Sequence, residues 1–140
     1  MKRAAYLGFK GLAWIIFAVV LLQFFFSGIA VFGEETWGDS AVLPHRIAGW
    51  LVILFSLVLL ILAAVSFFTG GMRGATVGMA ALLFVLSFVQ LVLAAAYYMD
   101  LPILAALHPV NALIVLGLSF HLARGVRTGP VEQTATARVQ

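Results

Sequence analysis

The chain has 140 residues, of which 64% are hydrophobic and 9% are charged, and its formal net charge is +3 at pH 7. Soluble domains carry about 25% charged residues, so this composition indicates a protein that resides in a lipid bilayer. The absence of cysteine excludes disulfide bonds, thiolate metal sites and cysteine nucleophiles. The basic residues are few and stand at the ends of apolar segments, so we interpret them as topology signals and expect no nucleic-acid partner.

Four apolar runs are long enough to cross the hydrocarbon core, which takes about 20 helical residues. In chain order they cover about 11–33, 44–68, 75–99 and 101–123. No cleavage site of small residues precedes the first run, so we interpret it as a retained span. Short connections favour antiparallel neighbours, and the predicted fold class is therefore an all-α integral membrane protein, an antiparallel four-transmembrane-helix bundle. We expect 1–125 to form this domain and 126–140 to form a flexible cytoplasmic tail.

The charged residues predict the orientation of the bundle. Arg46 is the only basic residue on one side, which also carries the acidic residues Glu34, Glu35, Asp39 and Asp100. All other basic residues fall on the opposite side: Lys2, Arg3, Lys10, Arg73, Arg124, Arg127 and Arg138. The positive-inside rule makes the second side cytoplasmic and predicts that both termini lie there.

The two halves of the chain resemble each other. The first half contains LLQFFFSGIAVF and then PHRIAG, and the second contains FVQLVLAAAYYM and then LHPVNA. Gln23 therefore matches Gln90, and His45 matches His108. Because the first and third spans run in the same direction, this pattern predicts a two-fold internal repeat of helix pairs about an axis along the membrane normal.

His45 and His108 both stand near the non-cytoplasmic starts of their spans, the second and the fourth. These spans can lie diagonally across the bundle, so the two side chains can face each other. Two neutral imidazoles that face each other are the axial ligands of a b-type haem. We therefore predict His45 and His108 as metal ligands and haem b as the cofactor.

Other residues complete the predicted cofactor site. Gly49 and Ala112 follow the histidines by four residues on the same helical face and would leave room for the macrocycle. Arg46 would pair with a haem propionate. Gln23, Gln90 and Asn111 have two readings: they bond helix to helix, or they bond the second nitrogen of a histidine or an edge of the haem.

His121 follows His108 by 13 residues, but Val58 stands at the matching place after His45, so we expect no second haem site. The spans hold no acidic residue or lysine that would relay an ion, which disfavours a transporter. No serine or threonine has a triad context, and hydrolysis is disfavoured as well. A redox carrier or haem-binding protein is thus favoured over a catalyst.

The segments QFFFSGIAVF, HRIAG, VQLVLA and LHPVNALIVLG lie between Gln23 and Leu122 and resemble a prokaryotic four-helix membrane family classed as a domain of unknown function. This resemblance implies a multi-pass protein of the prokaryotic inner membrane. More distantly, HRIAG and the second histidine resemble one four-helix half of haem A synthase, which implies His45 and His108 as axial ligands. Haem A synthase has a glutamate three residues before its histidine-arginine pair, whereas Val42 stands here. The resemblance therefore implies haem binding or electron carrying and not oxidative haem chemistry.

The leading hypothesis is a bis-histidine membrane cytochrome b that takes part in electron transfer or haem handling, with a membrane or periplasmic redox partner. A haem shared between the two chains of a homodimer would leave the same residue pattern. The alternative is a non-enzymatic packing or assembly subunit without a cofactor, in which the histidines and glutamines only bond across helices.

Overall fold

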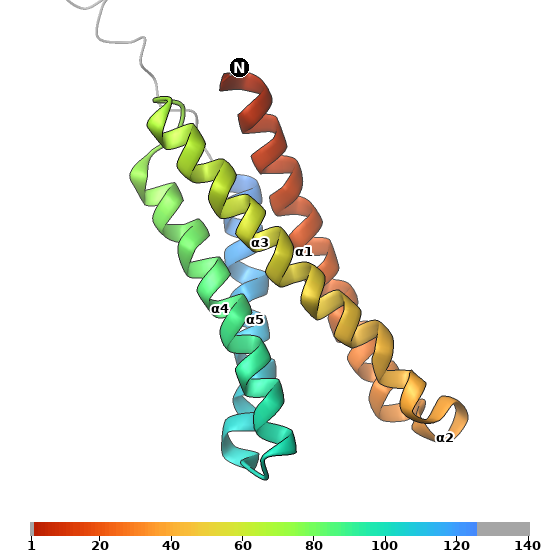
Figure 1. The fold of residues 1–140 in the computed structure, drawn as a ribbon. Helices are drawn as coiled ribbons and strands as arrows, with labels where there is room; N and C mark the ends of the chain where they lie inside the picture. The colour runs from red at the N-terminus through yellow and green to blue at the C-terminus, as the bar shows by residue number, and fades with distance from the viewer. Residues whose placement is uncertain (1, 126–140) are drawn as a thin grey trace, which may run out of the picture.

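The computed structural model describes residues 2–125, and every long element in this range is helical (Figure 1). Four long helices, α1 (Lys2–Phe32), α3 (Leu43–Phe68), α4 (Gly74–Tyr98) and α5 (Pro102–Gly125), are each long and apolar enough to cross a membrane. Their positions confirm the four predicted spans, although α1 begins nine residues before the expected 11. The predicted tail, 126–140, lies outside the described residues.

The connection between the first two spans is itself helical, a feature that the sequence pattern does not predict. It consists of α2 (Glu34–Trp37) and the 3-10 helix η1 (Gly38–Val42). The chain turns from α1 into α2 at Gly33, where a Cβ atom would lie 2.5 Å from both the Ile29 carbonyl oxygen and the Trp37 ring. Only glycine fits at this turn, because both neighbours already occupy the space that a side chain would take.

The four long helices form a ring in which each packs against two others. α1 packs against α3 and α5, and α4 packs against the same two helices. α3 and α5 are therefore diagonal to each other, as are α1 and α4. The bundle is antiparallel, and the diagonal placement of α3 and α5 confirms the arrangement on which the pairing of the two histidines depends.

The bundle consists of two helix pairs that diverge (Figure 1). The α1/α3 pair and the α4/α5 pair lie close together at the end that carries the N-terminus. They move apart toward the opposite end, which carries α2 and the turn between α4 and α5, and which we call the α2 end. The two pairs belong to different halves of the chain, residues 2–68 and 74–125, and they diverge toward the α2 end.

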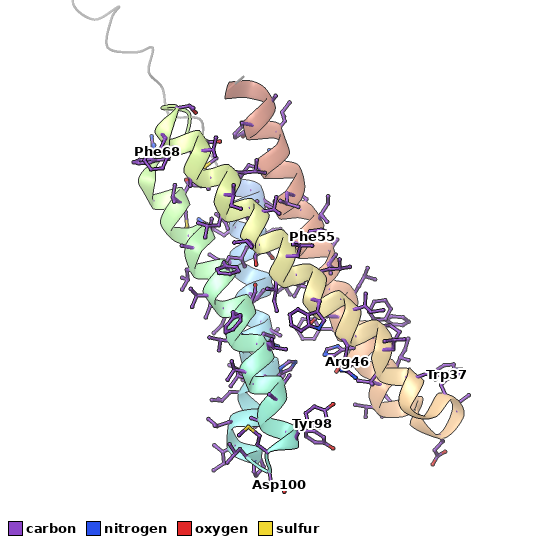
Figure 2. All side chains as sticks on the ribbon, viewed as in Figure 1. Trp37, Arg46, Phe55, Phe68, Tyr98 and Asp100 are labelled. Atoms are coloured by element: carbon purple, nitrogen blue, oxygen red, sulfur yellow. The ribbon has the colours of Figure 1, made fainter. Side chains whose placement is uncertain are left out.

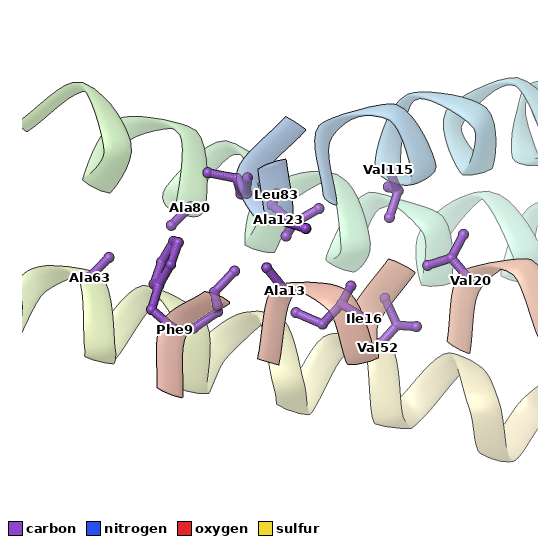
Figure 3. Packing of buried hydrophobic residues seen from close by; sticks show 12 residues of the cluster. Phe9, Ala13, Ile16, Val20, Val52, Ala63, Ala80, Leu83, Val115 and Ala123 are labelled. Atoms are coloured by element: carbon purple, nitrogen blue, oxygen red, sulfur yellow. The ribbon is translucent and has the colours of Figure 1, made fainter. Parts of the chain in front are cut away.

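The apolar core fills the part of the bundle where the pairs are close (Figure 3). In α1 it extends from Phe9 to Val20, and in α5 from Val115 to Ala123. Most large apolar side chains outside this core are exposed on the surface of the bundle, where lipid would cover them. Toward the α2 end, polar side chains such as Gln23, Gln90 and Asn111 follow the apolar core.

Candidate functional site

The two predicted ligand histidines meet across the bundle. His45 is the third residue of α3, and His108 is the seventh residue of α5. Their ring centroids are 6.0 Å apart and the ring planes are inclined by 53°. The diagonal packing thus brings the two imidazoles to a common depth, even though they stand at different distances from the starts of their helices.

Each histidine is held by a backbone carbonyl of the neighbouring helix in its own pair. Nδ1 of His45 lies 3.2 Å from the carbonyl oxygen of Gln23, and Nδ1 of His108 lies 3.1 Å from the carbonyl oxygen of Gln90. A carbonyl oxygen only accepts hydrogen bonds, so Nδ1 is the protonated nitrogen in both rings. In a neutral imidazole, Nε2 then carries the free lone pair.

These equivalent bonds show how the two halves repeat each other in space. α1 corresponds to α4 and α3 to α5, and in each pair the carbonyl of the matched glutamine lies beside the matched histidine. Of the two predicted roles of the glutamine side chains, Gln90 has the first: its amide bonds the His108 carbonyl and so joins α4 to α5. The second nitrogen of each histidine is bonded by the backbone carbonyl of Gln23 or Gln90 and not by the glutamine side chain.

A polar network supports the His108 half of the site. Gln90 Nε2 donates to the His108 carbonyl oxygen at 2.8 Å, and Asn111 Nδ2 donates both to Gln90 Oε1 at 2.6 Å and to the Leu86 carbonyl oxygen at 2.9 Å. Gln90 and Asn111 thereby join α4 to α5. Asn111 bonds no histidine ring nitrogen, and the Leu86 carbonyl is a partner that nothing in the sequence pattern indicated.

The His45 half lacks this network. Ala48 stands three residues after His45, where the second half has Asn111 three residues after His108. The Gln23 amide forms no hydrogen bond with a residue that the structure describes, and neither of its polar atoms is fully buried, since in residues 2–125 Ser66 Oγ is the one fully buried side-chain polar atom without a partner. The two halves share the histidine contact and differ in the support around it.

Gly49 accommodates the Gln23 amide. A Cβ atom at this position would lie 3.2 Å from Gln23 Nε2. The predicted role of the small residues Gly49 and Ala112 is to leave space for a cofactor. At Gly49 the missing side chain makes room for the glutamine, and Ala112, half-buried in α5, carries a methyl group at the matching position.

The remaining predicted site residue, Arg46, is exposed in the first turn of α3 (Figure 2). It lies on the α1/α3 side of the divergent end, whereas Tyr98 and Asp100 lie on the α4/α5 side. Arg46 follows His45 directly in the chain, and it lies at the α2 end of the bundle.

Two other features lie away from the histidines. An open apolar groove of about 450 Å³ follows α1 and α2, lined by Phe24, Phe25, Gly28, Ile29, Phe32, Gly33, Thr36 and Trp37. His121 is exposed near the end of α5 that is remote from His108. Among residues 2–125, no three or more histidine, aspartate or glutamate side chains gather as a metal site.

Comparisons with protein-family models, with curated proteins and with solved structures gave no match. The resemblances to the prokaryotic membrane family and to haem A synthase therefore stay predictions.

Proposed function

We propose that this multi-pass membrane protein binds one b-type haem, with His45 and His108 as the two axial ligands. The observation that carries the proposal is the pair of facing imidazoles whose Nδ1 atoms are both bonded to helix carbonyls. A histidine that ligates a metal ordinarily donates its other N–H to such an acceptor, which fixes the tautomer and the ring orientation.

The separation of the rings suits a shared metal. A metal–imidazole bond of about 2 Å, with about 1 Å from the ligating nitrogen to its ring centroid, puts two axial ring centroids about 6 Å apart. The observed separation is 6.0 Å. The two histidines come from different helix pairs, so a macrocycle held by both would lie between the two halves of the chain.

The surroundings of the pair favour a redox carrier. When bound, a haem supplies an iron that changes its charge by one electron. His45 and His108 would keep both axial positions filled, and the carbonyls of Gln23 and Gln90 would hold both rings in place. Fixed ligands of this kind favour electron transfer over the binding of a substrate at the iron.

We infer the orientation from the charges. The basic residues near the N-terminal end place that end in the cytoplasm, and both termini with it, so the histidine pair lies nearer the outer face of a prokaryotic inner membrane. A redox partner would then reach the site from the membrane or from the periplasm.

The test is the visible spectrum of the full chain, purified in detergent after expression with ample haem. We expect the reduced protein to show the sharp bands of a six-coordinate low-spin haem, with a pyridine haemochrome assay giving one haem b per chain. His108→Ala should abolish the low-spin spectrum, as should His45→Ala, because each removes one axial ligand.

His121→Ala is the matched control, since this third histidine is exposed and lies toward the other end of α5. It should leave the spectrum unchanged. A folded, helical but colourless wild-type protein would overturn the proposal and favour the packing-subunit alternative. Equal spectra for the wild type and both ligand variants would show that any haem binds elsewhere.

A further inference from the structure

Another open apolar groove lies between α1 and α5, and none of the residues of the proposed haem site lines it. It has a volume of about 280 Å³ and is lined by Phe17, Leu113, Leu116, Gly117 and Phe120. A Cβ atom at Gly117 would meet nothing within 4 Å, so the groove is open at this residue. Leu113 is 59% exposed and Phe120 is 36% exposed. The groove therefore faces the surrounding lipid, where acyl chains are available to fill it.

Three aromatic rings form a cluster at one end of the groove. The ring centroids of Phe17 and Phe120 are 5.3 Å apart, and Trp14 meets both rings edge-on, at 5.6 Å from Phe17 and 5.9 Å from Phe120. Aromatic pairs in this geometry attract each other beyond their apolar contact. The cluster thus joins α1 to α5 and holds the wall of the groove in place.

Two cations stand beyond this aromatic cluster. Arg124, in the last turn of α5, places its guanidinium carbon 5.3 Å from the centroid of the Phe120 ring, a cation–π contact that holds the charge beside the ring. Lys10 precedes Trp14 by four residues and lies one turn beyond it on the same face of α1. Because α1 and α5 are antiparallel and Trp14 meets Phe120, both cations lie at the same end of the groove.

No carboxylate within residues 2–125 is placed to balance these two cations. The acidic residues of this range belong to α2, to η1 and to the turn after α4, all at the α2 end (Figure 1). Arginine donates paired N–H bonds to phosphate oxygens, and basic pockets between membrane helices attract anionic headgroups. The charge at this end of the groove is therefore complementary to a phosphate that carries a net negative charge.

The dimensions fit one leaflet of a bilayer. Leu113 precedes Arg124 by 11 residues, which corresponds to about 16 Å along a helix. Half of the hydrocarbon core is about 15 Å thick. A lipid whose phosphate meets Arg124 can therefore lay an acyl chain along the groove as far as the middle of the membrane.

We propose that the groove between α1 and α5 is a binding site for one anionic phospholipid of the leaflet that surrounds the N-terminal end. Its phosphate pairs with Arg124 and Lys10, and one acyl chain lies against Phe17, Gly117 and Phe120. The site is separate from the histidine pair and does not depend on the proposed haem.

The experiment is native mass spectrometry of the full chain, delipidated in a neutral detergent and titrated with phosphatidylglycerol or with phosphatidylcholine of the same acyl chains. We expect the first phosphatidylglycerol to bind about fivefold or more tightly than the first phosphatidylcholine. Arg124→Gln should remove most of this preference. Arg73→Gln is the matched control and should keep it, because Arg73 lies at the same end of the bundle, in the turn before α4, and does not line the groove.

Gly117→Leu tests the groove separately from the charge. The new side chain would fill the open space while Arg124 and Lys10 stay, so we expect phosphatidylglycerol to bind about fivefold or more weakly. Gly78→Leu is its control, since Gly78 is exposed on α4 and its Cβ position is equally open. Leucine favours a helix over glycine, so neither variant should lose its fold.

The results can contradict each part of the site. Equal binding of the two lipids by the wild type, or equal losses in Arg124→Gln and Arg73→Gln, would overturn the headgroup site. Unchanged binding of phosphatidylglycerol by Gly117→Leu would overturn the groove as the place of the acyl chain. The visible spectrum of the protein plays no part in these outcomes, so they are distinct from the test of the haem.

Discussion

At the residue scale, the buried Asn111 amide shows that a polar side chain between apolar helices is stabilised by hydrogen bonds. Asn111 is 7% exposed, and it donates to a side chain and to a backbone carbonyl of the neighbouring helix. Such bonds join helices that have no hydrophobic driving force between them in lipid. Asn111 should therefore contribute more to the stability of the α4/α5 pair than its size suggests.

Replacing Asn111 by leucine keeps the branched shape of the side chain and removes both donated bonds. Gln90 Oε1 and the Leu86 carbonyl then lose a donor, and we expect the free energy of unfolding in detergent to fall by about 1–2 kcal/mol. Ser119→Ala is the control, because the Ser119 hydroxyl is equally buried but bonds only Leu116 of its own helix. Equal stability of the two variants would show that the network does not hold α4 to α5.

Gly49→Ala measures the cost of displacing the Gln23 amide. Alanine favours a helix over glycine by about 1 kcal/mol, but its Cβ atom would press on Gln23 Nε2. We expect the two effects to offset each other, so that unfolding in detergent changes by less than about 1 kcal/mol. Gly117→Ala has open space around its Cβ position and should show the helical gain alone. A larger gain at Gly49 than at Gly117 would contradict the close approach of Gln23.

At the element scale, the same turn ends α3 and α4 with different residues. After α3, Gly70 has φ +70° and the Gly71 N–H bonds the Ser66 carbonyl at 2.8 Å. After α4, Asp100 has φ +54° and the Leu101 N–H bonds the Ala96 carbonyl at 3.0 Å. Both are Schellman turns, in which glycine is the least strained residue at the left-handed position.

Asp100→Gly should therefore stabilise the protein, by about 0.5–1 kcal/mol, because it relieves the left-handed strain of a residue with a Cβ atom. Thermal unfolding in detergent is the measurement. The reverse exchange at the equivalent turn, Gly70→Asp, should destabilise by a similar amount. Should Asp100→Gly lower the unfolding temperature, a contact of the carboxylate would have to outweigh the strain.

At the scale of the whole molecule, the orientation of the bundle is open to a direct test because the chain has no cysteine. Ser40 is exposed at the α2 end, and Ala75 is exposed in the first turn of α4 at the other end. In intact cells, we expect a membrane-impermeant maleimide to label Ser40→Cys, and to label Ala75→Cys only after permeabilisation. The reverse pattern would overturn the predicted orientation and leave the fold unaffected.

The sequence by itself determined the four spans, because length and hydropathy alone decide which segments can satisfy their backbone within lipid. It also predicted that Gln23 is equivalent to Gln90 and that His45 is equivalent to His108, because an internal repeat can be recognised by comparing the two halves of the sequence. That the histidines meet at one depth was a geometric expectation, and only the packing of α3 diagonal to α5 decided it.

The supporting contacts came from the tertiary structure alone. No sequence pattern shows that backbone carbonyls, and not glutamine side chains, bond the histidine rings. Every residue has a carbonyl, and only the packing of the helices determines which carbonyl lies beside a ring. The close approach of the Gln23 amide to Gly49 is likewise visible only in the tertiary structure. Ala48 is unremarkable in the sequence, and it becomes informative only when the structure sets it opposite Asn111 in the other half.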